Sequence, residues 1–177
     1  LLSGFAAGDF YVQPAPVGQG AANHWCIARS PLHNADVLTN ENGVFMFSGS
    51  GLEPLTENIV EVLKDSVNWD AENKLRAAVY DNMYFVSTPF DTFTTNSRVI
   101  GVDLDTRNSW LMSRPRMSSV WNFRDDDGSE QLFFGDADSS VVWEMGGASS
   151  NLFFTPEWKS SWSDLGAPDQ EKSARRY

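Results

Sequence analysis

The chain has 177 residues, of which 41% are hydrophobic and 21% charged, a balance typical of a single folded domain and not of a disordered chain. Its formal net charge of −11 repels phosphate backbones, which argues against a direct grip on nucleic acid. The single cysteine, Cys26, excludes an internal disulfide. Because no apolar run approaches the roughly 18 residues of a membrane span, we expect no membrane segment, and no signal peptide either.

The first part of the chain predicts a β-hairpin. A short strand is expected over 24–29, ahead of the turn former Pro31, and another over 36–39. Residues 40–43, Asn-Glu-Asn-Gly, supply turn chemistry, and an aromatic strand over 44–48 returns from it.

One short helix is predicted next, from about Glu57 to Lys64 or a little beyond. Thr56 is expected to cap its first amides, and Glu57 lies at the positive end of the helix dipole. Apolar residues follow at helical spacing: Ile59, Val60, Leu63 and Val67.

The rest of the chain predicts short strands closed by polar turns. We expect a strand over 74–80, a turn at Asp81–Asn82, and a strand over 83–87, before a long loop over 88–97. Further strands are predicted over 98–104, 109–112, 117–123, 131–134, 141–144 and 153–158. The acidic turn 125–128 separates two of them.

This spacing predicts an all-β fold of antiparallel sheets in a sandwich, a barrel or a propeller. An internal echo favours the propeller, because "NGVFMFSGSG", "DNMYFVSTPF" and "SEQLFFGDAD" share a turn, an aromatic strand and a loop. Their centres, Phe47, Phe85 and Phe134, lie about 40 to 50 residues apart, as in propeller blades. We expect about three blades over residues 1–165, with the remaining blades upstream and residues 166–177 leading toward a further module.

The residues that carry chemistry form no convincing catalytic or metal site. Cys26 lies near His24 and His33, but no nucleophile motif or zinc-ligand spacing accompanies them, so we expect a buried structural thiol. The acidic turn 125–128 lacks the spacing of a calcium loop and predicts a solvated hairpin turn. We therefore predict neither a catalytic residue nor a cofactor or metal, and no enzymatic activity.

A second acidic turn gives an alternative. Residues 136–143, Asp-Ala-Asp-Ser-Ser-Val-Val-Trp, are similar to the Asp-box of sialidase-like propellers, which is a structural turn. Carboxylate pairs such as Asp103 with Asp105 are typical of ordinary acidic turns but also of glycosidases. Together with the seven tryptophans, they keep open a carbohydrate-binding or glycosidase-like propeller. A protein-interaction propeller of the WD type lacks its Gly-His and Trp-Asp signatures here.

The order of the motifs resembles the β-propeller of virion proteins from tailed bacteriophages, namely the tail hub or nozzle and DNA-stabilisation proteins of short-tailed phages. The resemblance covers roughly residues 35–165. It rests on the aromatic strand 43–48, "PLT..I" at 54–59, "AAVYDNMYFVS" at 77–87, "RVIGVDLDTRNSW" at 98–110 and "QLFFGDADSSVVWEM" at 131–145.

The resemblance implies a structural role in the virion tail, as a hub, nozzle or head-to-tail connector. It implies a ring of about six copies around a channel through which DNA passes without specific binding, in contact with neighbouring tail or connector proteins. We expect the loop residues Phe90, Phe93 and Thr94 to form an interface, unless the two phenylalanines fold back onto the sheet. Arg175 and Arg176 are expected to dock an acidic neighbour. The sequence begins at Leu1 without a starting methionine, and its end at Tyr177 looks like the middle of a chain. We therefore expect it to be a piece of a longer polypeptide.

Overall fold

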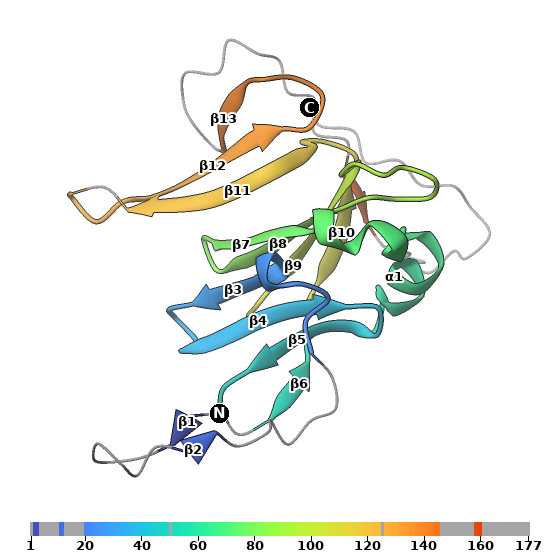
Figure 1. Ribbon diagram of the computed structural model, residues 1–177. Coiled ribbons are helices and arrows are strands. Elements are labelled where there is room, and N and C mark those ends of the chain that lie inside the picture. The colour runs from blue at the N-terminus through green and yellow to red at the C-terminus, as the bar shows by residue number, and fades with distance from the viewer. Residues whose placement is uncertain are drawn as a thin grey trace, which may run out of the picture.

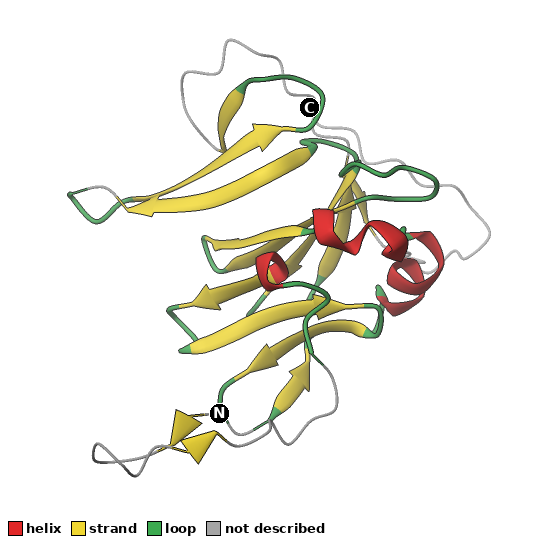
Figure 2. Cartoon of the chain, viewed as in Figure 1, coloured by secondary structure: helices red, strands yellow, loops and turns green. Residues whose placement is uncertain are grey.

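Figure 1 shows the computed structural model of the chain, which describes residues 2–3, 11–12, 20–49, 51–124, 126–145 and 158–160. The predicted all-β class is confirmed: antiparallel sheets make up the fold, with one short α-helix (Figure 2). Three of the sheets follow one another along the chain. A separate two-stranded pair joins β1 (Leu2–Ser3) to β2 (Tyr11–Val12).

The first sheet is a meander of four antiparallel strands. It runs in the order β3 (Ile27–Ser30), β4 (Ala35–Asn40), β5 (Gly43–Phe47) and β6 (Leu52–Pro54). The predicted hairpin is confirmed as β4 and β5.

The strand predicted over 24–29 is wrong at its start, where a 3₁₀ turn, η1 (His24–Cys26), precedes β3. The Asn23 side chain causes this turn, because its Oδ1 accepts hydrogen bonds from the backbone amides of Trp25, at 2.6 Å, and Cys26, at 3.2 Å.

The helix lies later than predicted, as α1 (Val60–Ser66), and Thr56 does not cap it. Leu55 instead donates its amide to the Val44 carbonyl at 2.9 Å and is buried beside the sheet. This pairing holds Thr56 in the chain before the helix, and its buried hydroxyl has no hydrogen-bond partner among the described residues. A 3₁₀ segment that the sequence did not predict, η2 (Trp69–Lys74), follows the helix and shortens the next strand.

The second sheet is a meander of β7 (Arg76–Tyr80), β8 (Met83–Thr88), β9 (Arg98–Asp103) and β10 (Ser109–Met112). The predicted turn at Asp81–Asn82 is confirmed, and both residues adopt the positive φ that a tight two-residue hairpin requires. A short strand, β14 (Trp158–Ser160), pairs with β10 and adds a fifth strand to this sheet.

The third sheet joins β11 (Met117–Arg124), β12 (Glu130–Asp136) and β13 (Val142–Met145). The prediction that 125–128 forms a turn between two strands agrees with this order. The predicted strand 153–158 falls mostly on residues outside the described ranges.

The three sheets stack face to face, with their first strands side by side. β3 lies against β7, and β7 lies against β11 (Figure 1). One buried cluster joins the first sheet to the second and includes Val37, Val44, Tyr84 and Ile100, with Leu63 of α1 among them. A second cluster joins the second sheet to the third through Phe85, Val99, Met117, Leu132 and Phe134.

The middle sheet is therefore buried on both faces, and its sequence alternates accordingly. In β8, Tyr84 and Val86 belong to the first cluster and Phe85 to the second; in β9, Ile100 and Val102 belong to the first and Val99 to the second. Successive side chains of a strand point to opposite faces, so each apolar run supplies two cores at once. Stacked meanders of this kind agree with propeller blades, although the described residues do not close a ring.

The structure corrects the equivalence expected among the three similar sequence motifs. Phe85 and Phe134 belong to the second core from opposite sides, whereas Phe47 lies on β5, half-buried and outside both clusters. Phe47 also sits on the third strand of its sheet, but Phe85 and Phe134 sit on second strands. The three aromatic centres are therefore not equivalent positions, even though the sheets recur at the predicted spacing.

The thiol of Cys26 is fully buried in the first core. It donates to the carbonyl of Thr39 at 3.3 Å, and the nearby Tyr84 hydroxyl donates to the carbonyl of Cys26 at 2.6 Å. Burial raises the pKa of the Cys26 thiol, so the reactive thiolate is disfavoured in the folded chain at neutral pH.

We expect N-ethylmaleimide at neutral pH to leave Cys26 unmodified in the folded protein and to modify it completely once guanidinium has unfolded the chain. Intact-mass measurement of both samples checks this. Because Cys26 is the chain's only cysteine, a single added maleimide reports on this position alone. Rapid labelling of the folded protein would contradict the buried placement.

Candidate functional site

The loop 88–97, predicted as an interface, is divided by the structure into a buried part and an exposed part. Phe93 is 48% exposed, and Thr94 beside it is exposed as well. Phe90 is only 5% exposed and packs into the first core, where it forms an isolated bridge with Val67.

The expected exposure of Phe90 is therefore wrong, because an aromatic ring at this point closes the space between the second sheet and the segment after α1. Phe93 and Thr94 keep their place as interface candidates. Arg175 and Arg176 lie outside the described residues.

Hydrogen bonds hold the exposed tip of this loop in place. The Asp91 amide donates to the Ser66 carbonyl at 2.7 Å, and the Asn68 side chain donates to the Phe93 carbonyl at 2.9 Å. Asn96 is 3% exposed and donates to the carbonyls of Lys74 and Met117, at 2.8 and 2.6 Å. The loop thus presents Phe93 and Thr94 from a fixed base, which favours a contact surface over a flexible lid.

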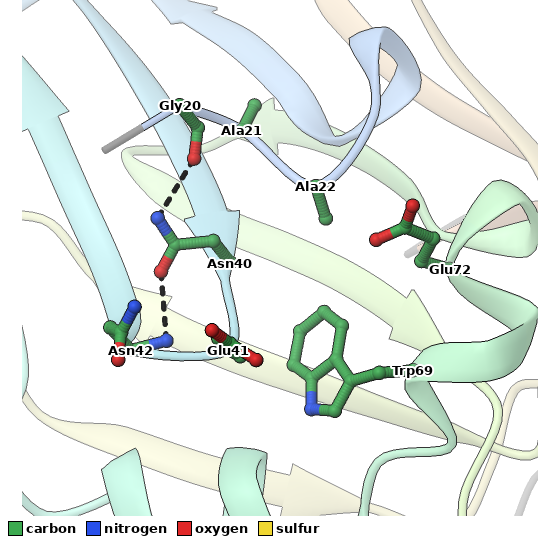
Figure 3. A pocket seen from close by; sticks show the side chains of 8 residues that line it. All are labelled: Gly20, Ala21, Ala22, Asn40, Glu41, Asn42, Trp69 and Glu72. Carbon is green, nitrogen blue, oxygen red and sulfur yellow. Dashed lines mark hydrogen bonds between the residues drawn. The ribbon is translucent and has the colours of Figure 1, made fainter. Parts of the chain in front are cut away.

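A shallow hollow with a volume of about 350 Å³ lies where the start of the first sheet meets η2 (Figure 3). Its walls are the small residues 20–22, the turn residues Asn40, Glu41 and Asn42, and Trp69 with Glu72. The indole of Trp69 stands between the Glu41 and Glu72 side chains. Its ring nitrogen is already used, since it donates to the Leu63 carbonyl at 2.8 Å.

The polar groups of this hollow divide into structural and available ones. Asn40 donates to the Gly20 carbonyl at 2.8 Å and accepts from the Asn42 amide at 2.8 Å, so its amide group holds the turn. Glu41 and Glu72 are exposed, and neither makes an ion pair with another described residue. An indole face with two carboxylates suits a neutral polyhydroxylated or a cationic ligand and repels anions. The sequence predicted residues 40–43 only as a turn, and it included Trp69 only as one of the seven tryptophans that keep a carbohydrate-binding alternative open.

The two histidines make separate contacts, and neither contact forms a reactive pair with Cys26. His33 contacts Asn82 Oδ1 at 3.0 Å and Asp105 Oδ1 at 3.4 Å through Nε2, which ties a turn of the first sheet to turns of the second. His24 stacks obliquely on the exposed Trp25. Among the residues that the structure describes, no three His, Cys, Asp or Glu side chains gather in the manner of a metal site.

The turn similar to an Asp-box joins β12 to β13 and organises itself. The Asp136 carboxylate accepts hydrogen bonds from the Asp138 amide, at 3.2 Å, and the Ser139 hydroxyl, at 2.6 Å. Asp138 pairs with Arg116 at 3.0 Å and with Arg114 at 3.7 Å on the surface. The Asp136 carboxylate therefore stabilises the turn, and Asp138 forms surface ion pairs. Both contacts agree with a structural role for this turn.

An exposed aromatic surface was missed by the sequence predictions. On the third sheet, Trp121 and Phe123 are 44% and 51% exposed, and the rings of Trp121 and Phe133 stack with centroids 5.8 Å apart. Val142 on the neighbouring strand is 58% exposed. Alternation along β11 was the available signal. Val120 packs against the second core, so Ser119 and Trp121 on either side of it face outward, as does Phe123.

Within the described part, no helix is long and apolar enough to cross a membrane. A scan against protein-family models and a search of the curated proteins find no match to this chain.

Proposed function

We propose that this chain is a structural, non-enzymatic component of a bacteriophage tail, a hub, nozzle or head-to-tail connector built on a β-propeller. The observation that carries the proposal is the stack of three consecutive antiparallel meanders with first strands side by side and an exposed aromatic face at one end. We expect such a stack to act through its surfaces, because exposed apolar patches mark interaction sites. The motif order over residues 35–165 supports the assignment to a phage tail.

The charge of the chain suits this role. At −11 it repels the phosphates of passing DNA, so DNA would move along a lumen lined by this protein without sticking to it. Its partners would be other copies of itself, in a ring of about six, and neighbouring tail or connector proteins that meet surfaces such as Phe93 and Thr94.

Electron microscopy of the purified particle tests this function. We expect density for the three-sheet stack on the tail axis, repeated as a ring, with peptides of this chain present in the mass spectrum of the same particles. A control preparation lacking tails should lose both signals together. Absence of the chain from purified virions would refute the phage-tail assignment.

The hollow at Trp69 supports a second candidate function, carbohydrate binding. An indole beside two carboxylates and an asparagine is a combination that stacks on sugar rings and bonds to their hydroxyls. A glycan array with the purified chain tests this function, and Trp69→Ala should abolish any binding that Trp25→Ala, a change at an exposed tryptophan elsewhere, leaves unchanged. Binding to no glycan would remove this candidate.

A further inference from the structure

We propose that the hollow at Trp69 binds a cation, the guanidinium group of an arginine side chain on a partner protein. Binding of this kind goes beyond the phage-tail proposal and does not depend on it. An arginine is also a ligand of a different chemical class from a carbohydrate, so one set of titrations separates the two at the same site. Three features point to it: a fixed indole, a carboxylate on each side of that indole, and more free acceptors than free donors.

The indole of Trp69 is held in place before any ligand arrives. Its Nε1 donates to the Leu63 carbonyl at 2.8 Å, and the half-buried ring packs against the first core. The residues beside it in the wall, 20–22, are small and leave room next to the ring (Figure 3). Among aromatic side chains, tryptophan attracts a cation to its face most strongly, and a guanidinium can also stack on it. The ring is therefore a preorganised platform for a cation.

Two carboxylates flank this platform from separate segments. Glu41 lies in the turn between β4 and β5, Glu72 lies in η2, and the indole stands between their side chains (Figure 3). Hydrogen bonds of the Asn40 side chain hold the turn, and the Asn23 side chain donates to the Glu72 carbonyl. Neither carboxylate pairs with a described cation, and none of the residues that line the hollow is a lysine or an arginine. The hollow thus has unbalanced negative charge beside its indole.

The hydrogen-bonding groups of the hollow suit a cation better than a sugar. A carboxylate only accepts hydrogen bonds and a guanidinium only donates them, whereas a sugar hydroxyl does both and needs both in return. Trp69 Nε1 and Asn40 Nδ2 already donate to backbone carbonyls, each at 2.8 Å. What the side chains still offer to a ligand is chiefly the acceptors of Glu41 and Glu72. A ligand that only donates and is positively charged matches this set.

The shape of the hollow favours a guanidinium on a protein over other cations. A guanidinium is planar, so it can lie on the indole face while the N–H groups at its edge reach the carboxylates on either side. The volume of about 350 Å³ suffices for one arginine side chain. Free arginine carries a carboxylate of its own, which Glu41 and Glu72 repel. An arginine within a polypeptide lacks that charge and is therefore the better match.

Titration of the ¹⁵N-labelled chain, followed by NMR, tests this binding. The probe is N-acetyl-arginine amide, and the readouts are the indole N–H of Trp69 and the backbone amides of Glu41 and Glu72. We expect these signals to shift and saturate. N-acetyl-citrulline amide, the neutral isostere, should bind at least about fivefold more weakly, because it loses the cation–π attraction and both ion pairs. About 1 M NaCl should also weaken binding of the arginine probe, because it screens exposed charges.

Neutral isosteres of the two glutamates show whether their charges are responsible. Glu41→Gln and Glu72→Gln should each weaken the arginine probe about two- to fivefold, since each removes one exposed ion pair. Both residues are exposed, so the fold should tolerate either change. Glu144→Gln is the matched control, because Glu144 is exposed on β13 of the third sheet and makes no ion pair with a described residue. It changes the net charge equally and should leave binding unchanged.

Four outcomes would overturn the proposal: no saturable shift with the arginine probe, equal binding of the citrulline probe, an effect of Glu144→Gln equal to that of Glu41→Gln, or free arginine that binds as tightly as the blocked form. Binding of cellobiose in place of the arginine probe, unchanged by salt, would favour the carbohydrate candidate. None of these results bears on whether the chain is present in virions, so the phage-tail proposal stands or fails by its own experiment.

Discussion

Phe90→Ala is expected to lower the free energy of unfolding by about 3 kcal/mol or more, whereas Phe93→Ala should change it by less than about 0.5 kcal/mol. The two residues have the same chemistry and lie three positions apart in one loop. Phe90 is 5% exposed and fills the first core beside Val67, so its removal leaves a cavity. Phe93 is 48% exposed, and its truncation opens no cavity.

Guanidinium unfolding followed by tryptophan fluorescence measures both variants against the wild type. The slopes with denaturant should agree, since neither change alters the surface exposed on unfolding by much. Equal losses in the two variants would show that the loop packs differently. A change that affects assembly but not stability is expected only at Phe93 or Thr94.

Asn96→Ala is expected to cost about 3 kcal/mol of stability, the second large effect. The Asn96 side chain is buried and donates to the carbonyls of Lys74, just before β7, and Met117, the first residue of β11. Alanine leaves the buried Met117 carbonyl and the partly buried Lys74 carbonyl without these donors, and each such loss costs about 1–3 kcal/mol. The loss should also weaken the contact between the loop 88–97 and the start of β11 in the third sheet.

Asn108→Ala is the matched control for Asn96→Ala. Asn108 lies on an exposed turn, where its side chain donates only to the hydroxyl of Thr106 at 3.1 Å. Chemical unfolding should place this variant within about 0.5 kcal/mol of the wild type. Hydrogen exchange adds a local test: amides of β11 should exchange faster in Asn96→Ala and unchanged in Asn108→Ala. If Asn96→Ala were as stable as the control, the two side-chain hydrogen bonds of Asn96 would be refuted.

The strands were largely predictable because their cause is local. Runs of β-branched and aromatic residues alternate with turn formers, and the Asp81–Asn82 turn fits only a tight hairpin. Errors occurred where a side-chain cap or a distant backbone contact replaced the expected strand or helix start. Asn23 winds residues 24–26 into a 3₁₀ turn, and the pairing of Leu55 with Val44 takes Thr56 away from the helix start.

The interaction surfaces were less predictable, because alternation states that a strand has two faces but not which face is covered. Phe90 and Phe93 look alike in the sequence, and only the packing of Phe90 beside Val67, in the segment after α1, separates them. Trp121 was missed because the position of the third sheet in the stack leaves its outer face open. The hollow at Trp69 joins residues that are far apart in the chain, 20–22, 40–42 and 69–72, so no single motif marks it.

The sequence by itself determined the all-β class, the order of short antiparallel strands and the acidic charge, because hydrophobic periodicity, turn chemistry and net charge act over a few residues or over the whole composition. Only the tertiary structure decided which side chains are buried between two sheets and which stay exposed. It buried Phe90 and Asn96, left Trp121 and Phe123 exposed, and placed β14 beside β10. Burial depends on what packs against a face, and for Phe90 and Asn96 the partners lie in the segments after α1 and in the third sheet.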